Sequence, residues 1–386
     1  MVLDQFFEQI KKQYDEKLPF VVYRKPNSSE LKRMFQHDDA LHVVVDFSES
    51  GFVFAPFDSL QEAYILPIEH ADVICAKFDK NDFSETEIRS HETSDIVNNN
   101  KESEKLSHIK HVEKGIEAIA KGSFSKVVLS RRELIENVGT SPIEIFKRLL
   151  QRYPTAFVYC WYHPKVGLWL GATPETLLNV RGDQLKTMSL AGTQAFEGSA
   201  DVIWKDKEKE EQQIVTDFIV ESLRESVGNW QFSSDFIKVS EQKTVRAGNL
   251  LHLQTEISMR LSPETSGLKP ILEALHPTPA VCGFPKDKSK SYIIENEGYP
   301  REFYAGFMGE LHLKETIRRN PNRRNVENNA YRVQKSVSDL YVNLRCMQVK
   351  DQQVFIYVGG GITKDSDPVS EWEETVHKSK IIKSVL

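Results

Sequence analysis

The chain has 386 residues, of which 40% are hydrophobic and 27% charged, with a formal net charge of -6 and a pI near 6.1. This is the composition of a globular protein with a large core, and its mild acidity disfavours a general binder of nucleic acids. The N-terminal residues lack the uninterrupted apolar run of a signal peptide, and no later stretch is long and apolar enough to span a bilayer. We therefore expect a cytoplasmic protein.

Length and cysteine spacing narrow the class of protein further. A chain of this length forms either two domains or one large body. The four cysteines lie far apart in the sequence, without a CxxC pair or a Cys/His cluster: Cys75, Cys160, Cys282 and Cys346. Neither a disulfide framework nor a zinc site is predicted.

Residues 1–104 are predicted to be a separate N-terminal region that packs on the same body as the rest of the chain. A short amphipathic helix precedes strand-like runs at 20–23, 41–45 and 51–54. The polar run 80–105 indicates an exposed connector. No catalytic pattern occurs in this region, so we expect the chemistry to lie in residues 105–386.

Two residues at the ends of predicted strands are candidates for acid–base chemistry. A helix over 103–121 leads into a strand at 126–130, which Lys126 opens. Glu175 follows the strand-like run 168–173 across a short turn. Without other evidence, Lys126 is a strand-end lysine that reaches solvent, and Glu175 is a carboxylate beside a helix N-terminus.

Two predicted helices each carry a pair of carboxylates at i,i+3 spacing. Glu208 and Glu211 belong to the first helix, Glu371 and Glu374 to the second, and Lys378 lies i,i+4 from Glu374. One interpretation is a solvated helix face whose ion pair contributes about 0.3–0.5 kcal/mol. The other is a shared hard cation such as Mg²⁺, which prefers oxygen ligands and keeps several waters.

Three further stretches bear on a site. The strand 354–358 runs into three glycines, 359–361, predicted as a turn that lets a backbone approach a ligand, and Ser366-Asp367-Pro368 predicts the start of a helix. The proline-rich loop 275–285 presents His276, although a lone histidine is more often structural. The segment 314–335 has a local charge of +5 and is interpreted as a solvated loop, with substrate steering or a partner contact as the alternative.

In chain order, the motifs KVVLSR, GATPE, LAGT, KExxEQ, HPTPAVCG, EFYAG, LRC, GGGI and SDPxxEWEET resemble those of the chorismate-utilising enzymes. This family contains isochorismate synthase, salicylate synthase and the large subunits of anthranilate and aminodeoxychorismate synthases. The resemblance covers roughly residues 105–386. It implies an α+β fold, a large two-layered antiparallel-sheet sandwich with helices outside. Within the family, KVVLSR and HPTPAVCG are similar to the isochorismate synthases.

The resemblance also implies a reaction and a role for each matching residue. Water would attack chorismate at C2 while the C4 hydroxyl leaves, with Lys126 as the general base and Glu175 as the general acid. Glu211 and Glu374 would ligate Mg²⁺, and Glu208 and Glu371 would reach the metal through water. The implied substrate-binding residues are Gly192, Thr193, His276, Tyr304, Arg345, Gly359, Gly360 and Lys378.

Some alternatives remain open at this point. Gln212 stands where many members of the family have histidine after the metal ligand. Salicylate synthase, which goes on to eliminate pyruvate, is the nearest alternative activity, and a non-catalytic binding protein that keeps the fold is the alternative from another class. The product would enter menaquinone or siderophore synthesis. We expect chorismate as the partner, no nucleic acid and no membrane. The oligomeric state is open, and a monomer is one of the alternatives.

Overall fold

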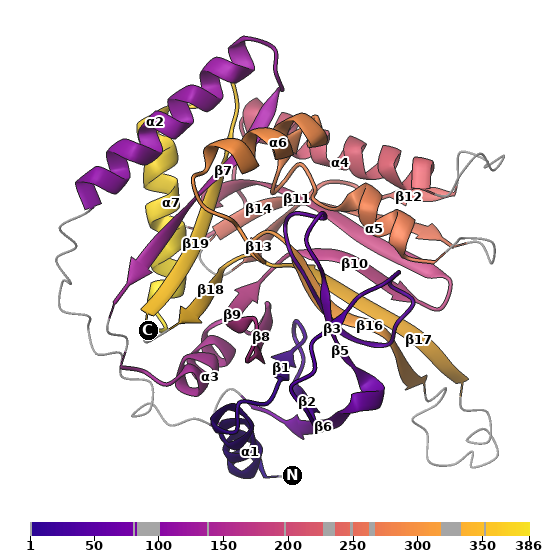
Figure 1. The fold of residues 1–386 in the computed structure, drawn as a ribbon. Coiled ribbons are helices and arrows are strands. Elements are labelled where there is room, and N and C mark those ends of the chain that lie inside the picture. Colours follow the sequence, from indigo (N-terminus) through magenta and orange to yellow (C-terminus); the bar gives the residue numbers. More distant parts are fainter. Residues whose placement is uncertain are drawn as a thin grey trace.

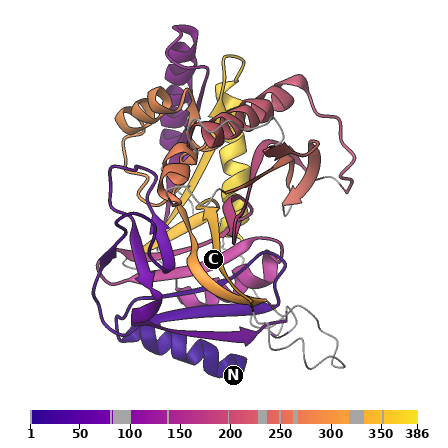
Figure 2. The same ribbon diagram turned by 90° about the vertical axis from the view of Figure 1, so that its right-hand side faces the viewer.

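The structure, a computed structural model, describes residues 2–79, 82, 101–136, 139–196, 198–226, 236–247, 250–261, 267–317, 333–350 and 353–386. These residues form two large antiparallel sheets with helices packed against them (Figure 1). The view from the side shows the N-terminal helix α1 at the bottom of the molecule and most of the other helices in its upper part (Figure 2). The predicted α+β class and two-layered antiparallel architecture are confirmed.

Sheet A is the nine-stranded sheet of the described residues. Its strands follow the order β15 (Gly283–Phe284), β7 (Lys126–Ile135), β19 (Gln353–Ile362), β18 (Cys346–Lys350), β9 (Gly167–Thr173), β8 (Phe157–His163), β1 (Phe20–Arg24), β2 (Glu30–Gln36) and β6 (Ala71–Lys77). The last strand in the chain, β19, therefore lies inside the sheet, between β7 and β18.

Sheet B is the ten-stranded sheet of the described residues. Its strands follow the order β12 (Ile237–Val239), β14 (Leu250–Arg260), β11 (Gln184–Ala195), β10 (Thr176–Arg181), β17 (Val333–Val342), β16 (Phe307–Ile317), β4 (Gly51–Ala55), β5 (Tyr64–Pro67) and β3 (His42–Val43), and β13 (Lys243–Ala247) pairs with β14. Strands from the N-terminal residues thus extend both sheets.

Helices cover the strands that border the candidate site. In chain order the helices are α1 (Leu3–Asp15), the 3-10 helix η1 (Ile68–His70), α2 (Lys101–Ala120), α3 (Pro142–Arg152), α4 (Asp206–Ser226), α5 (Lys269–Leu275), α6 (Lys286–Asn296) and α7 (Pro368–Lys383). Helix α4 packs on β11 and β14, α7 packs on β19, and α2 packs on both β7 and α7. In Figure 1, α2 and α7 lie side by side. None of the described helices is long and apolar enough to cross a membrane.

The core explains why several strands are apolar at every position. In β8, Phe157, Tyr159 and Trp161 belong to the cluster that includes the facing side of sheet B, whereas Val158 and Cys160 belong to the cluster that includes α1 and α3. The rings of Phe157 and Tyr341 stack across the two sheets with centroids 4.1 Å apart. A strand that is buried on both faces needs apolar residues at odd and even positions alike.

Helix α7 starts where the sequence predicts. The Asp367 side chain accepts a hydrogen bond from the Ser370 N–H at 2.8 Å, and Pro368 occupies the first helical position. This arrangement satisfies a free N–H at the helix start, and proline lacks the N–H that would otherwise be unsatisfied there. The cap fixes the direction in which the carboxylates of α7 point.

The three glycines after residue 358 do not form the predicted turn. They continue β19 and pair with β7, Gly359 opposite Ser130 and Gly361 opposite Val128. A Cβ on Gly359 would lie 2.9 Å from the Leu129 carbonyl oxygen, and one on Gly361 would lie 3.0 Å from Glu211 Oε1. Close approach inside a strand, rather than a turn, therefore explains the glycines.

Three further predictions concern the N-terminal boundary, the strand at 41–45 and the basic segment 314–335. The predicted boundary at 104/105 falls inside α2, and the division into two regions stays a prediction. The predicted strand at 41–45 is limited to His42–Val43. Of the basic segment, Lys314 and Lys335 lie on β16 and β17, whereas residues 318–332 lie outside the described residues, as does most of the connector 80–105.

Candidate active site

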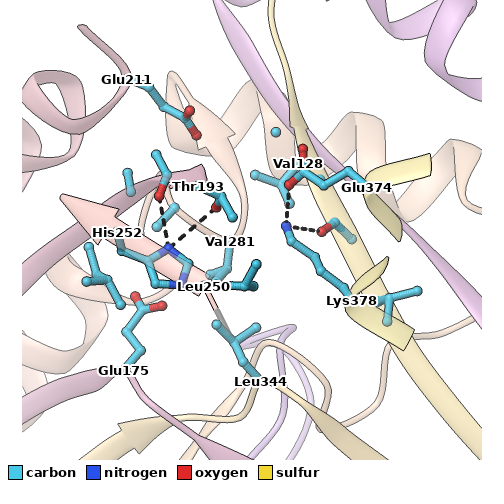
Figure 3. A pocket seen from close by; sticks show the side chains of 18 of the residues that line it. Val128, Glu175, Thr193, Glu211, Leu250, His252, Val281, Leu344, Glu374 and Lys378 are labelled. Carbon is cyan, nitrogen blue, oxygen red and sulfur yellow. Dashed lines mark hydrogen bonds and ion pairs between the residues drawn. The ribbon is translucent and has the colours of Figure 1, made fainter. Parts of the chain in front are cut away.

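A single pocket brings together most of the residues singled out in the sequence. Its walls come from β7, β11, β14 and β19, from the turn after β9, from the loop before α6, and from helices α4 and α7. Figure 3 shows Glu211, Glu175 and Glu374 directed into the same space from three different elements. Segments far apart in sequence therefore form one polar cavity.

Lys126 reaches the pocket through an ion pair. It is the first residue of β7 and is 1% exposed, and its Nζ lies 2.7 Å from Glu211 Oε1 on α4. Lys126 itself is not among the lining residues, but Glu211 is. The alternative of a lysine extending into solvent is wrong, because the ammonium is buried against a carboxylate.

Glu175 is a buried carboxyl with an unusual proton affinity. It lies just after β9 and is 5% exposed, and its N–H donates to Thr173 Oγ1 at 3.3 Å. Burial raises the pKa of Glu175 to about 7, although the positive charge of Lys126 opposes the shift. Since burial disfavours the carboxylate, Glu175 can carry a proton near neutral pH, as a general acid must.

The carboxylates of α7 face the pocket and are paired there. Lys378 Nζ lies 2.6 Å from Glu374 Oε1 and donates to the Gly359 carbonyl at 2.9 Å. Lys378 lowers the pKa of Glu374, whereas burial raises that of Glu371, which accepts a hydrogen bond from Ser366 Oγ at 2.7 Å. The predicted i,i+4 pair exists, but it lines a cavity and does not belong to a purely solvated face.

The fourth carboxylate, Glu208, has a buried oxygen that no described group satisfies. Glu208 packs over Gly192, whose φ is +71° and whose added Cβ would lie 3.2 Å from the Glu208 Cβ. Glu208 Oε2 is buried without a hydrogen-bond partner among the described residues. A buried carboxylate oxygen without a partner is costly unless a donor or a cation occupies the space beside it.

These carboxylates fit a magnesium ion better than a metal that needs a complete protein cage. All four line one pocket from α4 and α7, and all are hard oxygen donors. Within the described part of the chain, no three His, Cys, Asp or Glu side chains converge as a complete metal site. Mg²⁺ commonly takes one or two carboxylates and completes its shell with water and substrate.

His252 is a pocket residue that the sequence reasoning missed. Its Nδ1 lies 2.9 Å from the Gly192 carbonyl oxygen and 3.4 Å from Thr193 Oγ1, and its Nε2 lies 3.3 Å from Arg345 Nη2. Because a carbonyl only accepts, we assign the proton to Nδ1, which leaves Nε2 to accept from Arg345. Figure 3 shows the two contacts of Nδ1 as dashed lines.

The electrostatics agree with this tautomer. Burial, followed by the charge of Arg345, lowers the pKa of His252 to about 4, so the ring is neutral at pH 7. Burial also lowers the pKa of Arg345 to about 10, which still leaves the guanidinium charged. The only local signal for His252 is a polar residue within the apolar run Leu250-Leu251-His252-Leu253, and that run carries no motif.

His276 does not line the pocket, contrary to the sequence prediction. It follows α5 and packs edge-on against Phe307 with centroids 5.0 Å apart, and its Nε2 lies 3.3 Å from the Pro56 carbonyl oxygen. Burial lowers the pKa of His276 to about 3. The proline-rich loop instead contributes Ala280 and Val281 to the wall. The histidine therefore has the structural role that a lone histidine usually has.

The remaining predicted residues line the same pocket, and their roles stay predictions. Tyr304 and Tyr357 stack with centroids 5.4 Å apart and both line the pocket, as do Gly359 and Gly360. Gln212 lies outside the lining: its amide nitrogen is within hydrogen-bond distance of Ser189 Oγ, Thr216 Oγ1 and Thr255 Oγ1. This change from histidine therefore affects the packing of α4 on its sheet and leaves the predicted metal ligands in place.

The fold and the site together define a class of protein: a two-sheet α+β protein whose pocket is lined by carboxylates, lysines and an arginine. Residues 63–316 match the family model of the chorismate binding enzyme, and residues 331–384 match a second model with the same description. The chain belongs to the chorismate binding enzyme family. The resemblance seen in the motifs is confirmed.

Curated relatives and solved structures agree with this assignment. The salicylate biosynthesis isochorismate synthase of Pseudomonas aeruginosa is 28% identical over 284 residues, which cover 71% of this chain and 53% of that protein. The isochorismate synthase EntC of Escherichia coli K12 is 28% identical over 261 residues, with coverage of 65% and 59%. Both alignments thus span less than two thirds of the relative. A Bacillus anthracis structure described as the isochorismate synthase DhbC shares the fold with a TM-score of 0.73 at 20% identity, covering 98% of this chain and 99% of that one.

Proposed function

We propose that this protein is a Mg²⁺-dependent isochorismate synthase, which adds water at C2 of chorismate and removes the C4 hydroxyl. The observation that carries the proposal is the placement of Glu175, a carboxyl whose pKa burial raises to about 7, in the pocket that Glu211, the ion-pair partner of Lys126, lines from another side. An acid and a base in different environments are what a coupled addition and elimination needs. The names of the relatives support the same activity.

The atoms and protons of this reaction balance with these two groups. Lys126 can accept a proton only as the neutral amine, so its ammonium first releases a proton to solvent once the ion pair with Glu211 opens, and Glu175 regains a proton from solvent after the elimination. The amine takes a proton from water, and the resulting hydroxide forms the new C–O bond at C2. The double bonds of the ring shift, the C4–O bond breaks, and Glu175 gives its proton to the departing hydroxide, which leaves as water. One water is consumed and one is released, so the reaction is an isomerisation.

The pocket also offers groups for a substrate with two carboxylates. Arg345, oriented by His252, can donate two parallel hydrogen bonds to one carboxylate. Lys378 and the glycine strand lie at the α7 side, and the stacked rings of Tyr304 and Tyr357 provide a flat wall. Glu211 and Glu374 would hold Mg²⁺, with Glu208 and Glu371 through water. When bound, the ion would supply positive charge that offsets the repulsion between these carboxylates and an anionic substrate.

A product assay tests the proposal. Purified protein is incubated with chorismate and Mg²⁺, and the products are separated and identified. Isochorismate without salicylate or pyruvate is the expected result. Salicylate and pyruvate would identify the salicylate synthase alternative, and tight chorismate binding without any product would identify a binding protein. The product would supply menaquinone or siderophore synthesis, and deletion of the gene, followed by supplementation with each end product, separates the two pathways.

A further inference from the structure

Behind the pocket lies a buried ion pair that takes no part in the reaction above. Arg301 is 4% exposed and Glu297 is 6% exposed. Arg301 Nε donates to Glu297 Oε2 at 2.7 Å, and Nη2 also donates to Oε1 of the same carboxylate. The pair is therefore bidentate, the geometry in which arginine and a carboxylate hold one another most firmly.

The remaining hydrogen bonds of this pair go to the walls of the pocket. Arg301 Nη2 donates to the Val128 carbonyl at 2.7 Å, and Nη1 donates to the Val281 carbonyl at 2.9 Å. Val128 belongs to β7 and Val281 to the proline-rich loop, and both residues line the pocket. One planar guanidinium thus sets the spacing between two pocket walls that lie far apart in sequence.

Glu297 adds a second contact to β7, and the face of the guanidinium adds a contact to Tyr304. Glu297 Oε1 accepts from the Ser130 N–H at 2.7 Å and from Ser130 Oγ at 2.9 Å, and Ser130 is the residue opposite Gly359 in the sheet. The Arg301 Cζ lies 5.7 Å from the centroid of the Tyr304 ring, at cation–π range. Three parts of the pocket wall, namely β7, the proline-rich loop and Tyr304, therefore contact one ion pair.

We propose that Arg301, held by Glu297, is a positioning residue that fixes the width of the substrate pocket between β7, the proline-rich loop and Tyr304. The expected loss in kcat/KM rests on the proposed function, whereas the expected change in hydrogen exchange rests on the geometry alone. Lysine keeps the charge but has neither the fork nor the reach to two carbonyls and a carboxylate at once. Misplacing pocket walls by about 1 Å can cost on the order of 100-fold in rate.

The experiment compares Arg301→Lys with a matched variant elsewhere in the fold. Arg24 is 2% exposed and also donates to backbone carbonyls, those of Leu150, Tyr153 and Ala156. Unlike Val128 and Val281, these three residues do not line the pocket. Arg24→Lys therefore disturbs a similarly buried guanidinium without touching a pocket wall. Glu297→Gln is the second pocket variant, because the amide oxygen can still accept from Ser130 while the ion pair is lost.

Two readouts are taken for each variant. Hydrogen exchange of the intact protein should rise in peptides covering 126–130 and 278–284 for Arg301→Lys and Glu297→Gln, and in α3 for Arg24→Lys. For the fraction that is folded, kcat/KM for chorismate should fall by about 100-fold in Arg301→Lys and by less than threefold in Arg24→Lys.

The outcomes distinguish a positioning role of Arg301 from the general effect of changing a buried arginine. Unchanged exchange at both pocket segments, or equal kinetic losses in Arg301→Lys and Arg24→Lys, would overturn the positioning role. If the parent protein does not turn over chorismate, the proposed function fails while the exchange pattern still tests the geometry. If Arg301→Lys does not fold, Glu297→Gln supplies both readouts.

Discussion

Glu175 shows how a single residue can be suited to catalysis and unfavourable for stability. Burial raises its pKa to about 7, well above the value near 4.3 expected in an unfolded chain. The folded state therefore loses stability as the pH rises through this window, because an ionised carboxylate is disfavoured in the pocket. The proton that makes Glu175 an acid is lost over the same pH range.

We therefore predict opposite effects of Glu175→Gln on rate and on stability. Turnover should fall by on the order of 100-fold, because the amide keeps the shape but has no proton to transfer. At pH 8 the variant should be more stable than the parent by up to about 3 kcal/mol, and this difference should vanish below about pH 4. Steady-state kinetics and urea unfolding at several pH values measure both. A variant with full rate, or a parent whose kcat does not decline above pH 7, contradicts the assignment.

His252 leads to a prediction about tautomer and charge. With its pKa lowered to about 4, the ring should stay neutral down to about pH 5, with the proton on Nδ1. Nitrogen-15 NMR of the imidazole tests this directly, and a titration near pH 6.5 would show the assignment to be wrong. Replacing His252 by Ala should raise KM for chorismate about tenfold, since Arg345 loses the acceptor that orients it.

The candidate site could be predicted residue by residue only where a local pattern reports it. The carboxylate pairs of α4 and α7 follow from helical spacing, and the choice of Glu211, Glu374, Lys126 and Glu175 follows from the motifs that resemble the family. His252 could not be predicted, because its role depends on β14 lying beside β11, a pairing that no local signal encodes. His276 was placed wrongly for the related reason that a loop sequence does not tell which of its side chains points inward.

At the scale of elements, α4 lies near the middle of the chain and α7 near its C-terminus, and both line the same pocket. If both helices serve one Mg²⁺, chelation should abolish chorismate binding, and Mg²⁺ should restore it. Glu211→Gln and Glu374→Gln should each weaken Mg²⁺-dependent binding at least tenfold, and the double variant should lose far less than the sum of the two free energies. Titration calorimetry with and without Mg²⁺ makes the measurement.

Matched controls are available on the same two helices. Glu210 on α4 and Glu373 on α7 are exposed neighbours of the predicted ligands and do not line the pocket. Their changes to Gln should shift stability by no more than about 0.5 kcal/mol and leave binding as it is. If chorismate affinity depends neither on Mg²⁺ nor on any of the four substitutions, the metal site is removed from the proposal.

The elements themselves were predicted better than their pairing. Helices α2 and α7 begin near the predicted residues, because caps and apolar periodicity are local features of the sequence. The glycine run predicts a turn that lets a backbone approach a ligand, whereas in the structure it continues β19, and the close approach of Glu211 and Tyr304 to that strand explains the glycines. Sheet order likewise depends on contacts between distant residues.

At the scale of the whole molecule, a buried charge cluster joins the two sheets away from the pocket. Glu310 on β16 is 3% exposed and lies 2.6 Å from Lys25 and 2.8 Å from Lys32, and it also accepts from the Tyr23 hydroxyl. Burial opposes ionisation of Glu310, but the two lysines outweigh it and lower its pKa to about 2. The carboxylate thus links sheet B to strands β1 and β2 of sheet A.

We predict that Glu310→Gln destabilises the protein by about 3 kcal/mol at pH 7, as expected for breaking a buried pair. Because the folded pKa is depressed, this contribution is present above the unfolded pKa near 4.3 and disappears as the pH falls towards 2. Urea unfolding of parent and variant between pH 3 and 7 should show the gap closing. Glu315→Gln is the control on the same strand, since the Arg181–Glu315 pair is exposed and should contribute less than about 1 kcal/mol.

The position of β19 inside sheet A has a consequence for the order in which the chain can fold during synthesis. β7 and β18 have no shared neighbour until residues 353–362 leave the ribosome, although β7 is made far earlier. Loop closure over so long a segment is slow, and β7 has an unsatisfied edge in the meantime. Val128 and Ser130 of β7 lie opposite Gly361 and Gly359 of β19, so the pocket and the inner part of the sheet should acquire protection from hydrogen exchange together, in the last cooperative step of folding.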